Sequence, residues 1–224
     1  MKSYGQYCSV AKTLDLVGDR WTLLIVRELL LRGPIRYTDL RGGLPGIATN
    51  LLADRLRALE AAGVVAREEP GPPIATTLFR LTPRGEELRE ALEALGRWGI
   101  PLMVPGPAAG DAFRAPWLAF PAEQFLADRR PDGPPVRIEV RTAEGAIVIE
   151  SREGRIQTLP GTTEKPDAVL SGKSHAVLGL LTGRVDLPAA ESMGLRCEGD
   201  RAVLRRLLPK PIATAPEPAP KLSS

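Results

Sequence analysis

The chain of 224 residues has few of the side chains that support disulfide bonding, metal binding or histidine-based catalysis. Its two cysteines, Cys8 and Cys197, are too few for a disulfide framework or a cysteine metal cluster. His175 is the only histidine, so a zinc site or a histidine-based triad within one chain is nearly impossible. The sequence therefore predicts no catalytic residues, no metal and no cofactor, and we do not expect an enzyme.

Long apolar runs are also missing. No stretch reaches 18 apolar residues, so no membrane-spanning helix is predicted. The first ten residues, MKSYGQYCSV, lack the apolar core of a signal peptide. With 43% hydrophobic and 25% charged residues, the composition is that of a soluble globular protein, and we expect it in the cytoplasm. The net charge of +3 permits a local basic face but does not by itself indicate nucleic-acid binding.

The stretch GIATNLLADRLRALEAAG, residues 46–63, is predicted to form an amphipathic helix. Leu52, Leu56 and Leu59 follow the spacing i, i+4 and i+7 and so share one apolar face. The opposite face carries short polar groups and an arginine, namely Asn50, Asp54 and Arg57 beside Ala61, with Ala53 at its edge. Gly63 is expected to end the helix in the left-handed conformation that glycine adopts at little cost. Such a helix suits the second position of a helix-turn-helix, where it reads a DNA groove.

The segments around this helix fit a winged helix-turn-helix. Residues 8–31 are expected to form two helices separated by Gly18-Asp19, with Asp19 as the N-cap of the second. After Gly63, two short strands around a proline-rich tip predict a hairpin wing. Thr82-Pro83 then provides an N-cap and a first-turn proline for a long helix over residues 86–100.

The second half of the chain changes character after a short linker, VPGPAAG, at residues 104–110. Alternating apolar residues in VRIEVR, AIVIES and RIQTLP predict a meander of strands, and SHAVLGLLTGR predicts a helix. The tetrapeptide SGKS at residues 171–174 ends like a phosphate-binding loop, but Asp167 stands where that pattern needs glycine, so we reject it. Residues 210–224 have the composition of a disordered tail.

The N-terminal half resembles the HxlR family of bacterial winged helix-turn-helix regulators. The motifs that carry this resemblance are, in order, CSVAKTLDLVGDRWTLLIVRELL, RYTDL, GIATNLLADRLRALEAAGVVAR, FRLTPRGEEL and RW. The resemblance implies a homodimer built through the N-terminal and post-wing helices, with each recognition helix in a major groove. Two residues depart from the family pattern. Ala48 stands where a serine cap is usual, leaving Thr49 as an alternative cap, and Asp54 would repel phosphate or accept from a cytosine amino group.

The C-terminal half is similar to the sterol-carrier-protein-2-like fold, through VLSG, LLTGRVD and LRCEGDRAVLRRLL. This resemblance implies a sheet with helices over one face and an apolar cavity between them. The predicted fold class is therefore α+β, a winged helix-turn-helix domain followed by an SCP2-like α/β sheet domain. The expected boundaries are 1–103 for the DNA-binding domain, 104–110 for the linker, 111–209 for the ligand-binding domain and 210–224 for the tail.

The candidate site residues follow from these two resemblances and from the helix geometry. The residues proposed for DNA contact are Arg36, Thr49, Asn50, Ala53, Arg55, Arg57 and Arg67. Among them, Asn50 and Arg57 are assigned to base edges, whereas Arg55 is expected to reach either a phosphate or a carboxylate of its own domain. The plain alternative is a solvated helix face that contacts nothing.

A ligand cavity, if present, is expected to be lined by Ile138, Val140, Val148, Leu159, Leu178, Leu181 and Met193. An ordinary filled core would use the same residues equally well. Cys8 lies where many relatives carry a cysteine, and in some of them this residue senses oxidants or electrophiles. The alternative for Cys8 is a small buried side chain.

Together these features predict a dimeric transcription regulator that binds an inverted-repeat operator in double-stranded DNA. Such families commonly act as repressors, and we expect a repressor here. Its C-terminal domain is expected to bind a lipophilic effector. One alternative is a regulator that senses oxidants through Cys8, with a purely structural C-terminal domain. An alternative of another class is a cytoplasmic lipid carrier, for which the recognition helix would be surplus.

Overall fold

The computed structural model describes residues 3–71, 76–103 and 106–209. The chain forms two compact units, Met1–Leu95 and Gly96–Ser224, each with its own hydrophobic core. The predicted proline-rich wing tip lies partly outside the described residues, as do two linker residues and the predicted disordered tail. No helix in the described ranges is long and apolar enough to cross a membrane.

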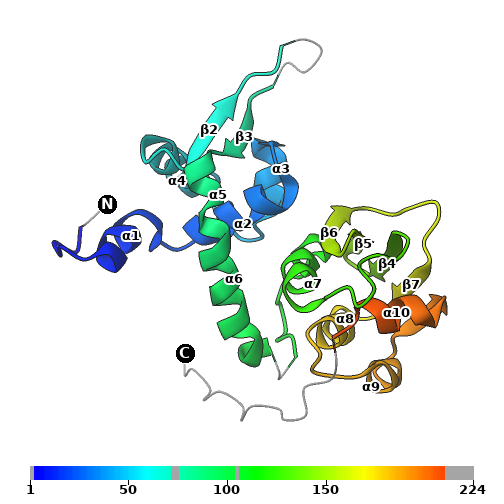
Figure 1. The fold of residues 1–224 in the computed structure, drawn as a ribbon. Helices are drawn as coiled ribbons and strands as arrows, with labels where there is room; N and C mark the ends of the chain where they lie inside the picture. Colours follow the sequence, from blue (N-terminus) through cyan, green and yellow to red (C-terminus); the bar gives the residue numbers. More distant parts are fainter. Residues whose placement is uncertain (1–2, 72–75, 104–105, 210–224) are drawn as a thin grey trace. The chain divides into compact units, whose positions relative to one another are not determined.

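The first unit is a winged helix-turn-helix (Figure 1). Its helices and strands are α1 (Ser9–Val17), α2 (Thr22–Arg32), β1 (Ile35–Arg36), α3 (Tyr37–Gly42), α4 (Thr49–Ala61), β2 (Val65–Glu68), β3 (Leu78–Leu81), α5 (Pro83–Glu86) and the beginning of α6 (Leu88–Gly99). The strands form a three-stranded antiparallel sheet in the order β1-β3-β2. The β2–β3 hairpin is the predicted wing, and its inward side chains Val65, Phe79 and Leu81 join the helices in one core.

Local sequence explains where several of these helices begin and end. Gly63 has a φ of +68° directly after α4, as predicted for a glycine in the left-handed conformation. The Thr82 hydroxyl accepts a hydrogen bond from the Gly85 N–H at 3.1 Å, which confirms the predicted cap. A Cβ at Gly85 would lie 2.1 Å from the Val64 carbonyl oxygen, so only glycine fits this close approach.

The start of α2 differs from the prediction. Asp19 does not cap this helix, because its side chain instead forms an ion pair with Arg55 of α4. The N-cap position is occupied by Trp21, whose φ of +80° places a bulky residue in the left-handed region. Thus the break between α1 and α2 is a strained turn that is held by a tertiary contact.

The second unit packs helices against a five-stranded sheet (Figure 1). Its elements after α6 are η1 (Ile100–Met103), η2 (Ala115–Leu118), α7 (Ala119–Phe125), β4 (Val136–Thr142), β5 (Gly145–Arg152), β6 (Arg155–Pro160), β7 (Ala168–Ser171), α8 (Ser174–Leu181), α9 (Leu187–Ser192), β8 (Arg196–Gly199) and α10 (Arg201–Leu207). The strand order is β6-β5-β4-β7-β8, and only the β4–β7 pair is parallel among the described strands. The observed architecture is therefore the predicted α+β class.

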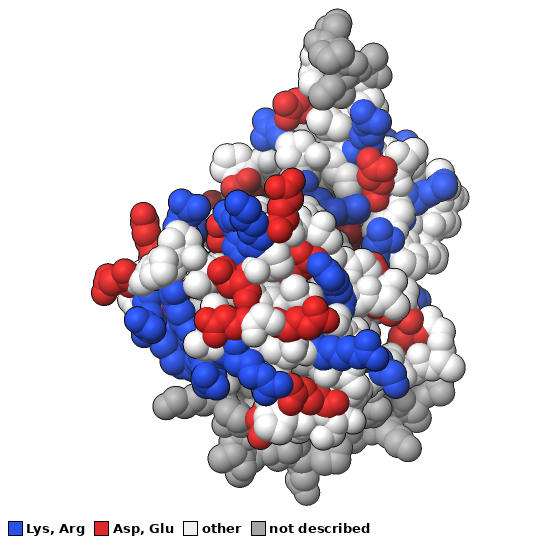
Figure 2. Space-filling view, turned by 90° about the vertical axis from the view of Figure 1, so that its right-hand side faces the viewer, with Lys and Arg blue, Asp and Glu red and all other residues white. Residues whose placement is uncertain are grey.

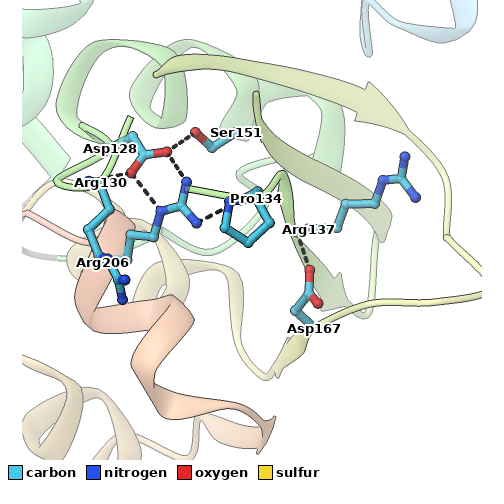
Figure 3. Close-up of polar contacts among 7 residues, drawn as sticks. All are labelled: Asp128, Arg130, Pro134, Arg137, Ser151, Asp167 and Arg206. Atoms are coloured by element: carbon cyan, nitrogen blue, oxygen red, sulfur yellow. Dashed lines mark hydrogen bonds and ion pairs between the residues drawn. The ribbon is translucent and has the colours of Figure 1, made fainter. Parts of the chain in front are cut away.

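Alternation along β4 and β5 directs apolar side chains into the core of this unit. Ile138, Val140, Ile147 and Ile149 are all nearly or fully buried there. A buried ion pair also anchors α10: the Asp128 carboxylate accepts two hydrogen bonds from Arg206, each 2.7 Å long, and a third from the Ser151 hydroxyl of β5 (Figure 3). Arg206 donates in addition to the Pro134 carbonyl at 2.8 Å. These contacts join the C-terminal helix to the sheet.

Candidate nucleic-acid interface

Helix α4 has one face fixed in the core and one face open to solvent. Leu52, Leu56 and Leu59 are each no more than 2% exposed, as their spacing predicts. Thr49, Asn50, Asp54 and Arg57 are exposed, whereas Ala53 and Arg55 are partly buried at the edges. The buried leucines set the rotation of the helix, so the polar face is directed outward by packing rather than by chance.

The N-terminus of α4 is held by the preceding helix. The Tyr37 hydroxyl donates to the Thr49 carbonyl oxygen at 2.7 Å, and Arg41 Nη1 donates to Thr49 Oγ1 at 3.1 Å. Ala48 occupies the N-cap without a side-chain hydrogen bond, and Thr49 is the first helical residue, so Thr49 does not provide the alternative cap. Arg41 was missed by sequence reasoning, because its closeness to Thr49 follows from how α3 packs on α4.

The two arginines of α4 have different surroundings. Arg57 is exposed and forms an ion pair with Asp54, which is also exposed. Arg55 is mostly buried and pairs with Asp19, a carboxylate of its own unit, which is the second of the two outcomes considered for it. Arg57 can therefore contact a duplex once its ion pair with Asp54 breaks. Arg55 instead stabilises the fold through its ion pair with Asp19.

The remaining candidates lie on the wing side. Arg36 is exposed at the end of β1, in the N-cap position of α3, where it is suited to a backbone phosphate. Arg67 forms an ion pair with Glu60, with Nε 2.8 Å from Oε1, and its guanidinium lies 5.5 Å from the centre of the Phe79 ring. Basic and acidic side chains are interspersed on the face of the molecule shown in Figure 2. The packing of α4, which buries its leucines and leaves Asn50, Asp54 and Arg57 exposed, marks the candidate interface.

Comparison with known proteins agrees with this geometry. Residues 16–105 match the family described as HxlR-like helix-turn-helix. An uncharacterized HTH-type transcriptional regulator of Synechocystis, sll1512, is 34% identical over 95 residues, which cover 42% of this chain and 70% of that protein. The chain belongs to the HxlR-like helix-turn-helix family. Residues 130–208 match the SCP-2 sterol transfer family, so an SCP-2 segment follows the HxlR-like one.

Further relatives match the HxlR-like chain in the same way. The uncharacterized HTH-type transcriptional regulator YvaP of Bacillus subtilis is 33% identical, and the match covers 42% of this chain and 86% of YvaP. Rv3095 of Mycobacterium tuberculosis, of the same description, is 32% identical over 60% of this chain and 68% of its own length. A solved structure of the B. subtilis transcriptional regulator YodB in reduced form is 27% identical, with a TM-score of 0.40, over 46% of this chain and all of that chain.

Cys8 of the HxlR-like unit is exposed directly before α1, not buried. The backbone N–H groups of Ala11 and Val10, in the first turn of α1, lower the pKa of the Cys8 thiol below its ordinary value. Cys197 differs, because burial raises the pKa of its thiol. Cys8 is therefore the thiol that is chemically suited to react with an oxidant or electrophile.

The expected ligand-lining residues of the SCP-2 segment separate into two groups. Ile138, Val140 and Leu181 are fully buried in the packed core, Val148 is buried in β5, and Leu159 is nearly half exposed on β6. Of the expected residues, Leu178 and Met193 line a pocket with a volume of about 450 Å³. The other five residues do not line it, since this pocket lies on the outer side of α8 rather than between helices and sheet.

Proposed function

We propose that this chain is a homodimeric transcriptional repressor that places α4 in the major groove of an inverted-repeat operator. The observation that carries the proposal is the division of α4 into a leucine face sealed in the core and a polar face open to solvent. Membership of a family whose relatives are named HTH-type transcriptional regulators supports the same role. Asn50 and Arg57 would contact base edges, and Thr49, Arg36 and Arg41 would contact the backbone.

Exposed apolar side chains support the dimer. On α6, Leu95 and Trp98 are 50% and 74% exposed, whereas Leu88 and Leu92 pack partly against the core of their own unit. Val10 of α1 is 64% exposed, which is unusual for an apolar helix residue without a partner. Burying these side chains would hold two copies together, and we propose that the dimer sets its two α4 helices about one DNA turn, roughly 34 Å, apart. This spacing is what half-sites of an inverted repeat require.

Sedimentation velocity tests the dimer with a matched pair of variants. Leu95→Glu puts a charge on the apolar face of α6, whereas Arg97→Glu puts the same group on the opposite side of the helix. We expect the first variant to sediment as a monomer and the second to remain a dimer. Monomeric wild-type protein at micromolar concentration would contradict the proposal.

An electrophoretic mobility shift with the DNA upstream of the chain's own gene tests operator binding. Arg57→Ala is expected to weaken binding about tenfold or more, a typical loss for one good base contact. Arg196→Ala removes the same charge from exposed β8 and serves as the control, with affinity expected to stay unchanged. If both proteins shift the DNA equally, Arg57 is not part of the interface.

We further propose that the SCP-2 segment binds a lipophilic effector that alters DNA binding. A ligand changes such an equilibrium only through a difference in affinity between two states, so the effector must bind the DNA-competent and DNA-incompetent dimers unequally. Extraction of the purified protein with organic solvent, followed by mass spectrometry, is expected to release an apolar compound. A protein that binds lipid but no DNA would instead be a lipid carrier.

The second candidate function is the sensing of oxidants or electrophiles through Cys8, which is favoured by the exposure and the lowered pKa of its thiol. Diamide treatment would then abolish the mobility shift of the wild-type protein but not that of Cys8→Ser. Cys197→Ser serves as the matched control and should stay sensitive to diamide. An unchanged wild-type shift after treatment would exclude this mechanism.

A further inference from the structure

The pocket of about 450 Å³ is enclosed by two parts of the second unit that are distant in sequence. One wall is formed by α8 and the residues that follow it, through Val185, with Met193 beside them. The other wall is formed by η1 and the stretch from Gly106 to Phe113. This second wall precedes residues 130–208, the range that matches the SCP-2 family, and η1 lies within the HxlR-like match. The pocket is thus lined by residues of both matched segments and of the stretch between them, all within the second unit.

Most of the pocket surface is apolar. The larger apolar side chains of its lining are Ile100, Leu102, Met103, Phe113, Leu178, Val185 and Met193. The Phe113 ring is held edge-on against Trp117, with 6.1 Å between the ring centres, so this wall is positioned by an aromatic contact. The volume lies in the usual range for small-molecule sites, roughly 300–1,000 Å³. The occupant therefore needs a sizeable apolar part.

The polar groups of the pocket favour a negatively charged head group. Arg184 lines the pocket directly after α8, and its guanidinium makes no hydrogen bond or ion pair with any residue that the structure describes. Asp111 is the one acidic side chain in the lining, and its Oδ2 already accepts from the Ala108 N–H at 2.8 Å. His175 and Ser174 add further hydrogen-bonding groups. A planar guanidinium pairs best with a carboxylate, to which it donates two parallel hydrogen bonds.

We infer that this pocket binds an amphiphilic carboxylate, with its head group on Arg184 and its apolar part against η1. Because η1 directly follows α6, an occupant that packs on Ile100, Leu102 and Met103 orders the segment through which α6 leaves the HxlR-like unit. The regulatory consequence rests on the proposed function, in which α6 belongs to the dimer. The binding site itself does not depend on it.

Isothermal titration calorimetry of the full chain with three twelve-carbon probes tests the site. Dodecanoate is expected to bind, whereas dodecyltrimethylammonium and dodecan-1-ol should bind more weakly. Arg184→Gln should weaken dodecanoate binding about tenfold or more, as expected for a lost charge-assisted hydrogen bond, and Arg184→Lys should restore part of the affinity. Arg155→Gln, an exposed arginine on β6, is the charge-matched control and should bind like the wild type. Equal binding of all three probes, or no binding at all, would overturn the assignment.

Hydrogen exchange followed by mass spectrometry tests the coupling to η1. Dodecanoate should slow amide exchange in peptides covering Ile100–Met103 of the wild type but not of Arg184→Gln. Unchanged exchange on dodecanoate binding would refute the coupling. The mobility shift without added dodecanoate distinguishes the two proposals, because loss of the pocket leaves operator binding intact, whereas failure of the repressor proposal abolishes the shift.

Discussion

Arg55 of α4 forms an ion pair with Asp19, which lies 36 residues earlier, in the break between α1 and α2. Both side chains are partly buried, so the contact is shielded from solvent more than an ordinary surface pair. The pair joins the candidate recognition helix to the strained turn at Trp21. It therefore holds α4 at the edge of its buried face, away from the exposed residues Asn50, Asp54 and Arg57.

Asp19→Ala should lower the stability of the HxlR-like unit. The expected loss in free energy of unfolding is about 1 kcal/mol, the upper end for a partly exposed ion pair. Urea unfolding would be followed through Trp21 emission in a Trp98→Phe, Trp117→Phe background. The control is Asp54→Ala, which removes a more exposed ion pair and should change stability much less. Equal losses in both variants would show that the Asp19 pair has no special role.

Asp54→Asn is expected to raise operator affinity, by about threefold or more, because it removes a negative charge from the DNA-facing side. It also frees the Arg57 guanidinium from the ion pair that occupies it in the unbound chain. The measurement is a mobility shift at two salt concentrations, compared with Glu60→Gln, which instead frees Arg67. A fall in affinity for Asp54→Asn would mean that this carboxylate accepts from a base, such as a cytosine amino group.

The fold of the HxlR-like unit could be predicted where one local rule decides the outcome. The leucine spacing of α4, the left-handed Gly63 and the Thr82 cap each depend on residues within one turn of the chain. The cap on α2 could not be predicted, because Asp19 has two possible partners. In the structure Asp19 pairs with Arg55 and does not accept from the free N–H groups of α2. Because Arg55 lies far away in the sequence, this choice could be seen only in the folded structure.

The lining of the candidate ligand site, by contrast, could not be predicted from the sequence. Alternation predicts that Ile138 and Val140 face inward, but it does not reveal whether the space around them is filled. The pocket is instead lined in part by Gly106 and Pro107, two residues expected to form a linker. Arg184 carried no signal in the sequence beyond its position after a helix. Its importance arises from the pocket that surrounds it.

Cys8 should react with iodoacetamide faster than Cys197 at neutral pH. The lowered pKa of the Cys8 thiol gives more thiolate at a given pH, whereas burial raises the pKa of Cys197 and limits access to it. Single-cysteine variants, Cys197→Ser and Cys8→Ser, would be alkylated across pH 6–9 and quantified by mass spectrometry (roughly the range in which thiols titrate). The rate for Cys8 should reach its plateau at the lower pH. Identical profiles would contradict the different surroundings of the two thiols.

The buried contact between Asp128 and Arg206 predicts a pH-dependent stability of the second unit (Figure 3). Hydrogen bonds from Arg206, with further ones from Ser151 and the Arg130 N–H, hold the pKa of the Asp128 carboxyl well below its usual range. Asp128→Asn leaves the Arg206 guanidinium buried without its counter-charge. We expect a loss of about 3 kcal/mol in free energy of unfolding at neutral pH, typical of breaking a buried pair.

The sign of the pH dependence follows from the lowered pKa. The folded state binds the Asp128 proton more weakly than the unfolded state, whose aspartate pKa is about 3.9, so this stabilisation is complete above that value and declines as the pH falls below it. The difference between wild type and Asp128→Asn should therefore stay constant from about pH 7 to 5 and narrow below about pH 4. This difference in unfolding free energy is measured by urea unfolding in a Trp21→Phe background, through the emission of the tryptophans of the second unit. The control is Asp132→Asn, at an exposed position. A difference that persists undiminished to about pH 2 would show that Asp128 stabilises the fold through its shape and hydrogen bonds rather than through its charge.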